Sequence, residues 1–181
     1  MIKIYDNIVP PQIQIFLDHW IHNTAKFKNF KGFPLYYNSH LTSKNQSYDP
    51  GFTNMFLCDW YNSLGKDSAS LLTPLYYLSY NLKFIITKIL QGRVFLQTPR
   101  GNIDPQPPHV DRKDPHFVCL YYVNDSDGNT IFYNNNKEII KSISPKKGRI
   151  VLFDGSILHS GSHPKNTTRT VININFNKID I

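Results

Sequence analysis

The chain has 181 residues, of which 40% are hydrophobic and 18% are charged, a composition that fits one globular domain and excludes an intrinsically disordered chain. Its formal net charge of +7 would attract an anionic partner, although charge alone does not distinguish a nucleic acid from an acidic peptide or a small carboxylate. Glu138 is the single glutamate among thirteen acidic residues, which excludes sites built on paired glutamates or on a His-Glu-x-x-His helix.

Cysteine content and hydropathy indicate the compartment. Cys58 and Cys119 are too few for a disulfide scaffold in a chain of this length, so a reducing compartment is expected. The opening MIKIYDNIVPP lacks the apolar core of a signal peptide, and no apolar run approaches the roughly 18 residues of a membrane span. We therefore expect a cytoplasmic, intracellular protein with no membrane partner.

Two amphipathic helices are expected in the first half of the chain. After a strand-like IKIY, the apolar residues that follow a pair of prolines recur at the i, i+3, i+4, i+7 and i+8 spacing of a helix. A second stripe with the same period predicts a helix from Thr73 to Gln91, which Gly92 would end. Residues 23–66 lack sustained periodicity and are expected to form loops with short strands.

Two segments of this loop region have alternative interpretations. In AKFKNFKGF, residues 25–33, lysines alternate with phenylalanines, a pattern that can hold a nucleic-acid strand or form a solvated loop whose aromatic rings anchor in the core. Residues 32–52 are expected to supply substrate loops, in which Tyr36, Tyr37 and Tyr48 would either line the mouth of a pocket or pack in the core.

The second half of the chain, from Arg93, reads as a series of strands. Short runs rich in β-branched and aromatic residues are separated by Gly, Pro, Asn and Asp: RVFLQ, FVCLYYV, TIFYN, EIIKSI, RIVLF and TVININF. They predict a jelly-roll or barrel with the two helices packed on one outer face. We expect a single domain over residues 1–181, in which residues 1–92 form a helical and loop part and residues 93–177 form the β core.

Alternation along the last run predicts two different faces. One face is apolar and can pack in the interior: Thr170, Ile172, Ile174 and Phe176. The other is polar and cationic, as the lining of a pocket would be: Arg169, Val171, Asn173 and Asn175.

A possible metal site begins in QPPHVDRKDPHF, where His109 and Asp111 are two residues apart. In an extended backbone both side chains point the same way, whereas on a helix they would diverge by about 200°. His159, in LFDGSILHSGSHP, can supply a third ligand from another strand. Two imidazoles and one carboxylate suit Fe(II) and leave positions open for a co-substrate and oxygen, while zinc can use the same ligands. Taken alone, His-x-Asp is common in surface turns.

Arg169 follows His159 by ten positions and lies on the polar face of the last predicted strand. A guanidinium among uncharged pocket residues needs an anion, and its planar fork binds a carboxylate at two points. Such an arginine would hold the far carboxylate of a small diacid. The alternative is an arginine paired with a surface aspartate.

His109-x-Asp111, His159 and Arg169, in this order, resemble the motif of the 2-oxoglutarate (2OG) and Fe(II)-dependent oxygenases. The segments CLYYVNDSDGNTIFYNN and SPKKGRIVLFDGSILHSG extend the resemblance to the prolyl-hydroxylase-like branch, including small phage and viral members. The similarity covers residues 93–177. It implies a mostly β fold with some α-helix, namely a double-stranded β-helix, or jelly-roll, backed by N-terminal helices.

The resemblance also implies roles for individual residues. His109, Asp111 and His159 would hold the iron and act as the catalytic residues, and Arg169 would bind the C5 carboxylate of 2OG.

Two further residues would complete the co-substrate site. Tyr122 would donate a hydrogen bond to the same carboxylate, unless a one-residue slip exchanges it with Tyr121. Thr130 lies where the family often has a Gly-Gly-x-Thr segment, and the pair before it here is Gly128-Asn129.

The activity implied is that of a hydroxylase, a dioxygenase that uses Fe(II), 2OG and O2, with ascorbate as a reductant, and releases succinate. Related halogenases have a small residue where this chain has Asp111, so hydroxylation of a C–H bond is expected. The expected substrate and partner is a prolyl residue in a protein or peptide. The alternatives are a nucleobase within a nucleic acid, a small molecule, or a non-catalytic β-barrel module that binds a metal.

Overall fold

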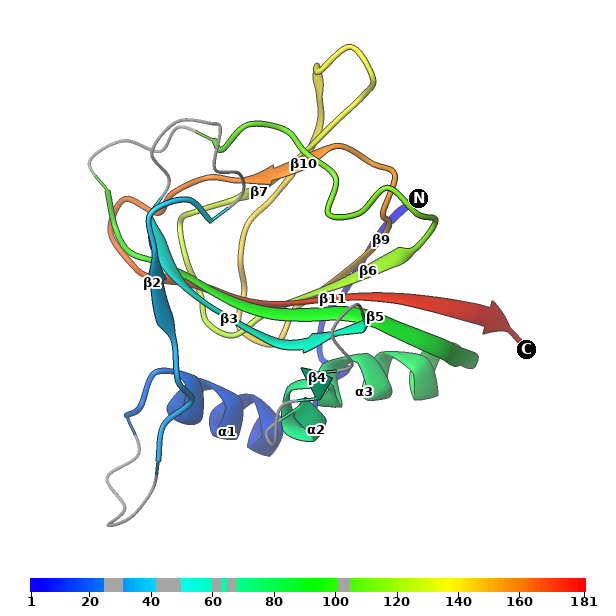
Figure 1. The fold of residues 1–181 in the computed structure, drawn as a ribbon, viewed down its shortest axis with the longest axis horizontal. Helices are drawn as coiled ribbons and strands as arrows, with labels where there is room; N and C mark the ends of the chain where they lie inside the picture. Colours follow the sequence, from blue (N-terminus) through cyan, green and yellow to red (C-terminus); the bar gives the residue numbers. More distant parts are fainter. Residues whose placement is uncertain (25–30, 42–49, 60–62, 65–67, 101–104) are drawn as a thin grey trace.

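The computed structural model describes residues 1–24, 31–41, 50–59, 63–64, 68–100 and 105–181. Two β-sheets face each other, and helices cover the outer face of the larger sheet (Figure 1). No helix among these residues is both long enough and apolar enough to cross a membrane.

The two sheets are antiparallel throughout. The larger one has the order β1 (Ile2–Tyr5), β9 (Ile150–Asp154), β6 (Phe117–Tyr122), β11 (Arg169–Asp180), β5 (Phe84–Gln97), β3 (Gly51–Cys58) and β2 (Tyr36–Asn38), and β4 (Ser63–Leu64) pairs with β3. The smaller one has the order β10 (His159–Gly161), β7 (Thr130–Tyr133) and β8 (Ile139–Ile143).

The path of the chain between the sheets defines the fold. From β6 the chain crosses from the larger sheet to β7 and β8, returns to β9, crosses again to β10 and returns to β11. Such alternation between two facing sheets is that of a double-stranded β-helix. The fold class predicted from the sequence, mostly β with N-terminal helices behind the sheet, is therefore confirmed.

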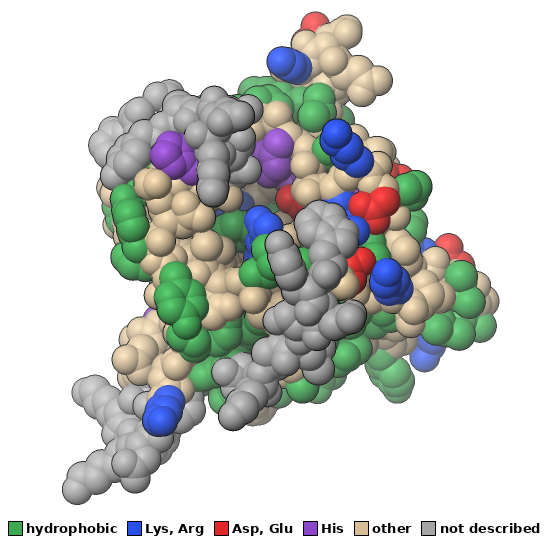
Figure 2. Space-filling view, viewed as in Figure 1, with side chains coloured by type: hydrophobic (Ala, Val, Ile, Leu, Met, Phe, Trp, Pro, Cys, Tyr) green, Lys and Arg blue, Asp and Glu red, His purple; other side chains and the backbone are tan. Residues whose placement is uncertain are grey.

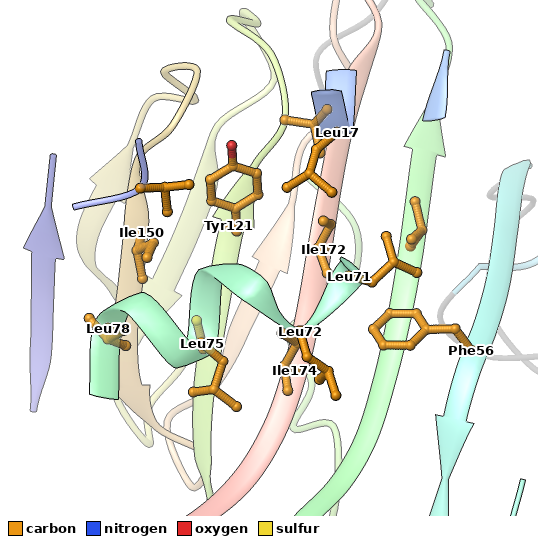
Figure 3. Packing of buried hydrophobic residues seen from close by; sticks show 14 of the residues in the cluster. Leu17, Phe56, Leu71, Leu72, Leu75, Leu78, Tyr121, Ile150, Ile172 and Ile174 are labelled. Carbon is orange, nitrogen blue, oxygen red and sulfur yellow. The ribbon is translucent and has the colours of Figure 1, made fainter. Parts of the chain in front are cut away.

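The helices α1 (Pro11–Ile21), α2 (Ser68–Leu71) and α3 (Thr73–Leu82) pack against the larger sheet on the side away from the smaller one (Figure 1). Figure 3 shows Leu75 and Leu78 on the helix that lies over the strands carrying Ile150, Ile172 and Ile174, and all five belong to one core cluster. All five side chains are fully buried. Burial of apolar surface between the helices and the sheet is thus a main source of stability in this layer.

We expect Leu75→Ala to lower the free energy of unfolding by about 2–5 kcal/mol, because the deletion leaves a cavity in a well-packed core. Urea unfolding followed by circular dichroism would measure the change. Tyr80, on the same helix, is 72% exposed, and Tyr80→Ala should change stability by no more than about 0.5 kcal/mol. Equal effects of the two substitutions would contradict the assignment of this helix face to the core.

The two faces predicted for the last strand are both present in β11. Ile172, Ile174 and Phe176 belong to the core under the helices, whereas Arg169 and Asn173 line a pocket between the sheets. The alternation expected of an extended strand therefore holds over this segment.

The predicted second helix begins at Thr73, as expected, but the prediction is wrong from Lys83 onward. Lys83 has the left-handed φ of 56°, and residues 84–97 form β5. Ile85, Ile86 and Ile89 share a spacing compatible with a helix, yet β-branched residues favour strands, and pairing with β11 supplies their partners. The sequence of this segment is compatible with both a helix and a strand, and pairing with β11 makes it a strand.

Gly92 lies within β5 instead of ending a helix. A Cβ at this position would lie 2.5 Å from two ring carbons of Phe56 on the neighbouring strand. The glycine therefore makes room for an aromatic ring of the core.

Residues 23–66 contain the eight-residue strand β3 in addition to the short strands expected. Tyr36 and Tyr37 lie on the edge strand β2 and are 64% and 60% exposed, which contradicts the core alternative. Their place at the mouth of a pocket stays a prediction, and Tyr48 lies outside the described residues. Phe33 is buried against Trp20, with ring centroids 5.2 Å apart, as the core-anchor interpretation of 25–33 requires. Residues 25–30 lie outside the described part of the chain.

Candidate functional site

A pocket opens between the two sheets. The larger sheet contributes residues of β5 and β11 to its lining, and the smaller sheet contributes β7, β10 and the segment 106–111. In the space-filling view, histidine side chains lie around a hollow with acidic and basic side chains beside them (Figure 2). Most of the residues singled out in the sequence analysis meet here.

Backbone pairing brings the two histidines together. His109 and His159 exchange two hydrogen bonds, each amide nitrogen donating to the other carbonyl oxygen at 2.9 Å. Their rings consequently lie on the same side, with centroids 4.9 Å apart. Pro107 and Pro108 have no N–H to donate, so the segment before His109 joins the smaller sheet only through isolated contacts.

Asp111 faces both imidazoles. Its Oδ1 lies 3.9 Å from Nε2 of His109 and 3.8 Å from Nε2 of His159. One ligand atom from each of the three residues falls within 4.8 Å of the others, a separation that one metal ion can bridge. The structure thus assembles the trio that the sequence motif predicted.

Hydrogen bonds prepare the ligand atoms for a metal. Nδ1 of His109 lies 3.1 Å from the carbonyl oxygen of Pro107, and Nδ1 of His159 lies 3.0 Å from that of Ile157. A carbonyl oxygen only accepts, so each Nδ1 carries the proton and each Nε2 presents a lone pair to the site. Asn173 Nδ2 donates to Oδ2 of Asp111 at 2.9 Å, which leaves Oδ1 directed at the histidines.

Electrostatics keep these groups in their metal-binding forms. Burial alone would raise the pKa of Asp111, but the two imidazoles, Asn173 and Arg93 outweigh burial and hold that pKa below its ordinary value. Burial lowers the pKa of His159, against the attraction of Asp111. An ionised carboxylate and a neutral imidazole are the states that bind a metal. The donor set therefore fits Fe(II).

We expect Asn173→Ala to weaken Fe(II) binding about 10–100-fold, the usual effect of removing a hydrogen bond that orients a metal ligand. Anaerobic competition with a chromophoric chelator would measure the affinity. Asn177 lies on the same strand outside the pocket, so Asn177→Ala is the matched control and should bind iron like the wild type. Equal affinities in all three proteins would show that the amide does not orient Asp111.

Arg169 lies in the same pocket with neutral partners. Its Nε donates to the carbonyl oxygen of Gly128 at 2.9 Å, Nη1 to Oε1 of Gln97 at 2.8 Å, and Nη2 to Oγ1 of Thr130 at 2.7 Å. Because a guanidinium has five N–H groups, one on each terminal nitrogen remains. The side chain is 5% exposed, and among the described residues it forms no ion pair. A buried cation with one N–H group left on each terminal nitrogen suits a carboxylate, which can accept at two points.

The surroundings of Arg169 add further donors. Nε2 of Gln97 is buried without a hydrogen-bond partner among the described residues. Oγ1 of Thr130 accepts from Arg169 and, at 2.6 Å, from the hydroxyl of Tyr122, which leaves its own proton to donate. Both residues line the pocket, so this end of the pocket fits one carboxylate of 2OG.

The structure separates the two candidate tyrosines. Tyr122 lies inside the barrel, where its hydroxyl donates to Thr130, and burial raises its pKa so that it stays a neutral donor. Tyr121 lies on the helix side of the sheet. Tyr122 reaches the pocket through Thr130 and is not itself part of the lining, so its direct hydrogen bond to 2OG remains a prediction.

Among the pocket residues that were not proposed from the sequence are three with long polar side chains, Arg93, Gln97 and Gln106. The signal for two of them was present, because Arg93 and Gln97 are four positions apart in RVFLQ and so share one face of an extended strand, as Arg169 and Asn173 do in the last strand. Gln106 follows a segment outside the described residues, and its amide nitrogen donates to the carbonyl oxygen of Gly161 at 2.9 Å.

Comparisons with known proteins agree with this geometry. Residues 101–177 match the family model of the 2OG-Fe(II) oxygenase superfamily. No curated protein matches the sequence. This match agrees with the resemblance of the β core to these oxygenases, and the structures that follow, among them prolyl hydroxylases, share the fold.

Solved structures share the fold at low identity. A Trichoplax adhaerens prolyl hydroxylase in complex with a hypoxia inducible factor oxygen degradation domain peptide fragment is 15% identical, with a TM-score of 0.63 over 97% of this chain and 82% of that one. The viral collagen prolyl hydroxylase of Paramecium Bursaria Chlorella virus-1, in complex with 2OG, is 12% identical, with a TM-score of 0.58 over 97% and 94%. A 2OG-Fe(II) oxygenase family oxidoreductase from Burkholderia pseudomallei is 10% identical, with a TM-score of 0.71 over 97% and 84%.

Proposed function

We propose that this chain, whose residues 101–177 match the 2OG-Fe(II) oxygenase superfamily, is an Fe(II)- and 2OG-dependent dioxygenase that hydroxylates a C–H bond of a prolyl residue in a protein or peptide. One observation carries the proposal. The three ligand atoms of His109, Asp111 and His159 share a pocket with Arg169, whose two remaining N–H groups have no anionic partner among the described residues.

Bound together, Fe(II), 2OG and O2 would supply the oxidising power for hydroxylation, with 2OG converted to succinate and CO2. The chain supplies orientation. Arg169 and Thr130 would fix the far carboxylate of 2OG at one end of the pocket, and Asn173 holds Asp111 toward the histidines. Fixing both reactants in one geometry is a large part of what such a site contributes to the rate.

Apolar side chains limit water in the same pocket. Phe95, Leu120 and Val171 line it beside the polar groups, and Leu120 and Val171 are 5% and 2% exposed. A site from which water is excluded strengthens the interaction between Arg169 and a bound carboxylate.

The choice of a prolyl substrate is supported by the similar structures. Two of them are prolyl hydroxylases, and one of these was solved with a peptide fragment. These two structures are 12–15% identical to this chain, and such a likeness concerns the fold. The prolyl substrate is therefore a proposal.

The test is an anaerobic titration of the protein with Fe(II) and then 2OG, followed by O2 and detection of succinate. We expect a visible charge-transfer band that requires both Fe(II) and 2OG, and succinate after O2 is admitted. Zn(II) in place of Fe(II) should give neither. A protein that shows no band and unfolds when a chelator is added would instead be a structural metal protein.

A further inference from the structure

Arg93 is a second pocket arginine, whose charge helps to keep Asp111 ionised but which has no ligand of its own in the proposed reaction. It lies on β5 directly opposite Asn173 of β11, whereas Gln97 of the same strand lies opposite Arg169. Four residues of strand span roughly 13 Å, so Arg93 and Arg169 enter the pocket from opposite ends. Asp111 is near the Arg93 end, because Asn173 hydrogen-bonds it.

The guanidinium of Arg93 has donors to spare. With the amide of Gln91 turned so that its oxygen faces the arginine, this oxygen accepts from Nε at 3.0 Å and from Nη2 at 2.9 Å. Three of the five N–H groups then remain. The ring of Phe95 lies 6.0 Å from Cζ, and among the described residues Arg93 forms no ion pair.

The charges of the pocket leave this cation uncompensated. Asp111 is the one carboxylate among the lining residues described, against two arginines. Fe(II) and 2OG carry opposite charges of equal size, so their joint binding leaves the balance unchanged at one excess positive charge. Arg169 would face the far carboxylate of 2OG. The one positive charge without a negative partner is therefore that of Arg93. A partly buried cation of this kind is stabilised when a ligand brings an anion.

We propose that Arg93 binds a carboxylate of the substrate, and hence that the substrate class is a carboxylate-bearing prolyl compound. This inference rests on the proposed function of the same site. Two sources share the chemistry: the α-carboxylate of a free amino acid, and an acidic side chain next to a prolyl residue in a peptide. The net charge of +7 would favour the approach of either one.

Binding to the anaerobic Fe(II)–2OG protein, in which no turnover occurs, tests the inference by calorimetry. The probes are two matched pairs: L-proline with L-prolinamide, and acetyl-Gly-Pro-Asp-amide with acetyl-Gly-Pro-Asn-amide. We expect the carboxylate member of one pair to bind at least about tenfold more tightly than its amide, the effect of one hydrogen-bonded charge pair. The pair that shows the preference identifies the source.

Substitutions test whether Arg93 causes the preference for the carboxylate over its amide. Arg93→Gln should abolish the preference and Arg93→Lys should keep part of it, while the charge-transfer band reports an unchanged affinity for 2OG. Lys88→Gln is the matched control, because Lys88 is a cation of the same strand whose side chain is 59% exposed, and it should keep the preference.

Three results would overturn the inference: no preference in either pair, a preference that survives Arg93→Gln, or a loss of 2OG affinity in Arg93→Gln. The last would place Arg93 in the co-substrate site. A wild-type protein without a charge-transfer band would contradict the proposed oxygenase itself, and the two failures are therefore distinguishable.

Discussion

Replacing His109 with alanine is expected to abolish the formation of succinate. It should also lower the affinity for Fe(II) by more than about 10–100-fold, the usual effect of removing a residue that only hydrogen-bonds a metal-binding side chain. Two protein ligands would remain, His159 and Asp111, and neither can take over the vacated position. The side chain of His109 is 28% exposed, so its loss should leave the fold intact. Anaerobic titration and circular dichroism would measure both properties.

His19→Ala is the control for this experiment. His19 lies on α1, on the outer side of the larger sheet, where its ring contacts Thr24. The variant should bind Fe(II) and form succinate as the wild type does. Unchanged iron affinity in His109→Ala would mean that the metal is held by another set of residues.

Replacing Arg169 with glutamine is expected to raise the dissociation constant for 2OG at least about 100-fold. Hydrogen bonds to a charged group contribute about 1.5–3 kcal/mol each, and Arg169 has two N–H groups left for a carboxylate. Fe(II) affinity without 2OG should not change, because the arginine touches none of the three ligands. The intensity of the charge-transfer band as a function of 2OG concentration measures the effect.

Two further variants sharpen the result. Arg169→Lys keeps the charge but loses the planar fork, so its 2OG affinity should lie between those of the wild type and Arg169→Gln. Arg149 is paired with Asp6 outside the pocket, and Arg149→Gln should bind 2OG normally. If Arg169→Gln kept full affinity for 2OG, the carboxylate would have to bind elsewhere.

The strands and the metal trio could be predicted because their signals are local or exact in spacing. His109 and Asp111 are two residues apart, and an extended backbone alone brings them to one side. The six β runs were bounded by turn residues, and each corresponds to a strand of the structure or part of one.

Other features depend on contacts that the sequence does not specify. The end of the second helix was missed because pairing of β5 with β11 overrides a helical apolar period over residues 84–91. The place of Tyr121 and Tyr122 depends on the register of β6, which only the neighbouring strands determine. The hydrogen bonds of the histidine Nδ1 atoms depend on loop geometry around Pro107 and Ile157.

The backbone bridge between His109 and His159 has a consequence for the stability of the barrel. Both histidines belong to the side of the smaller sheet, whereas Asp111 is hydrogen-bonded to Asn173 of the larger one. A metal bound by these residues would cross-link the two sheets at the mouth of the barrel. The hydrogen bond from Asn173 to Asp111 already joins this edge to the larger sheet, so a bound metal would add stability to an edge that is formed without it.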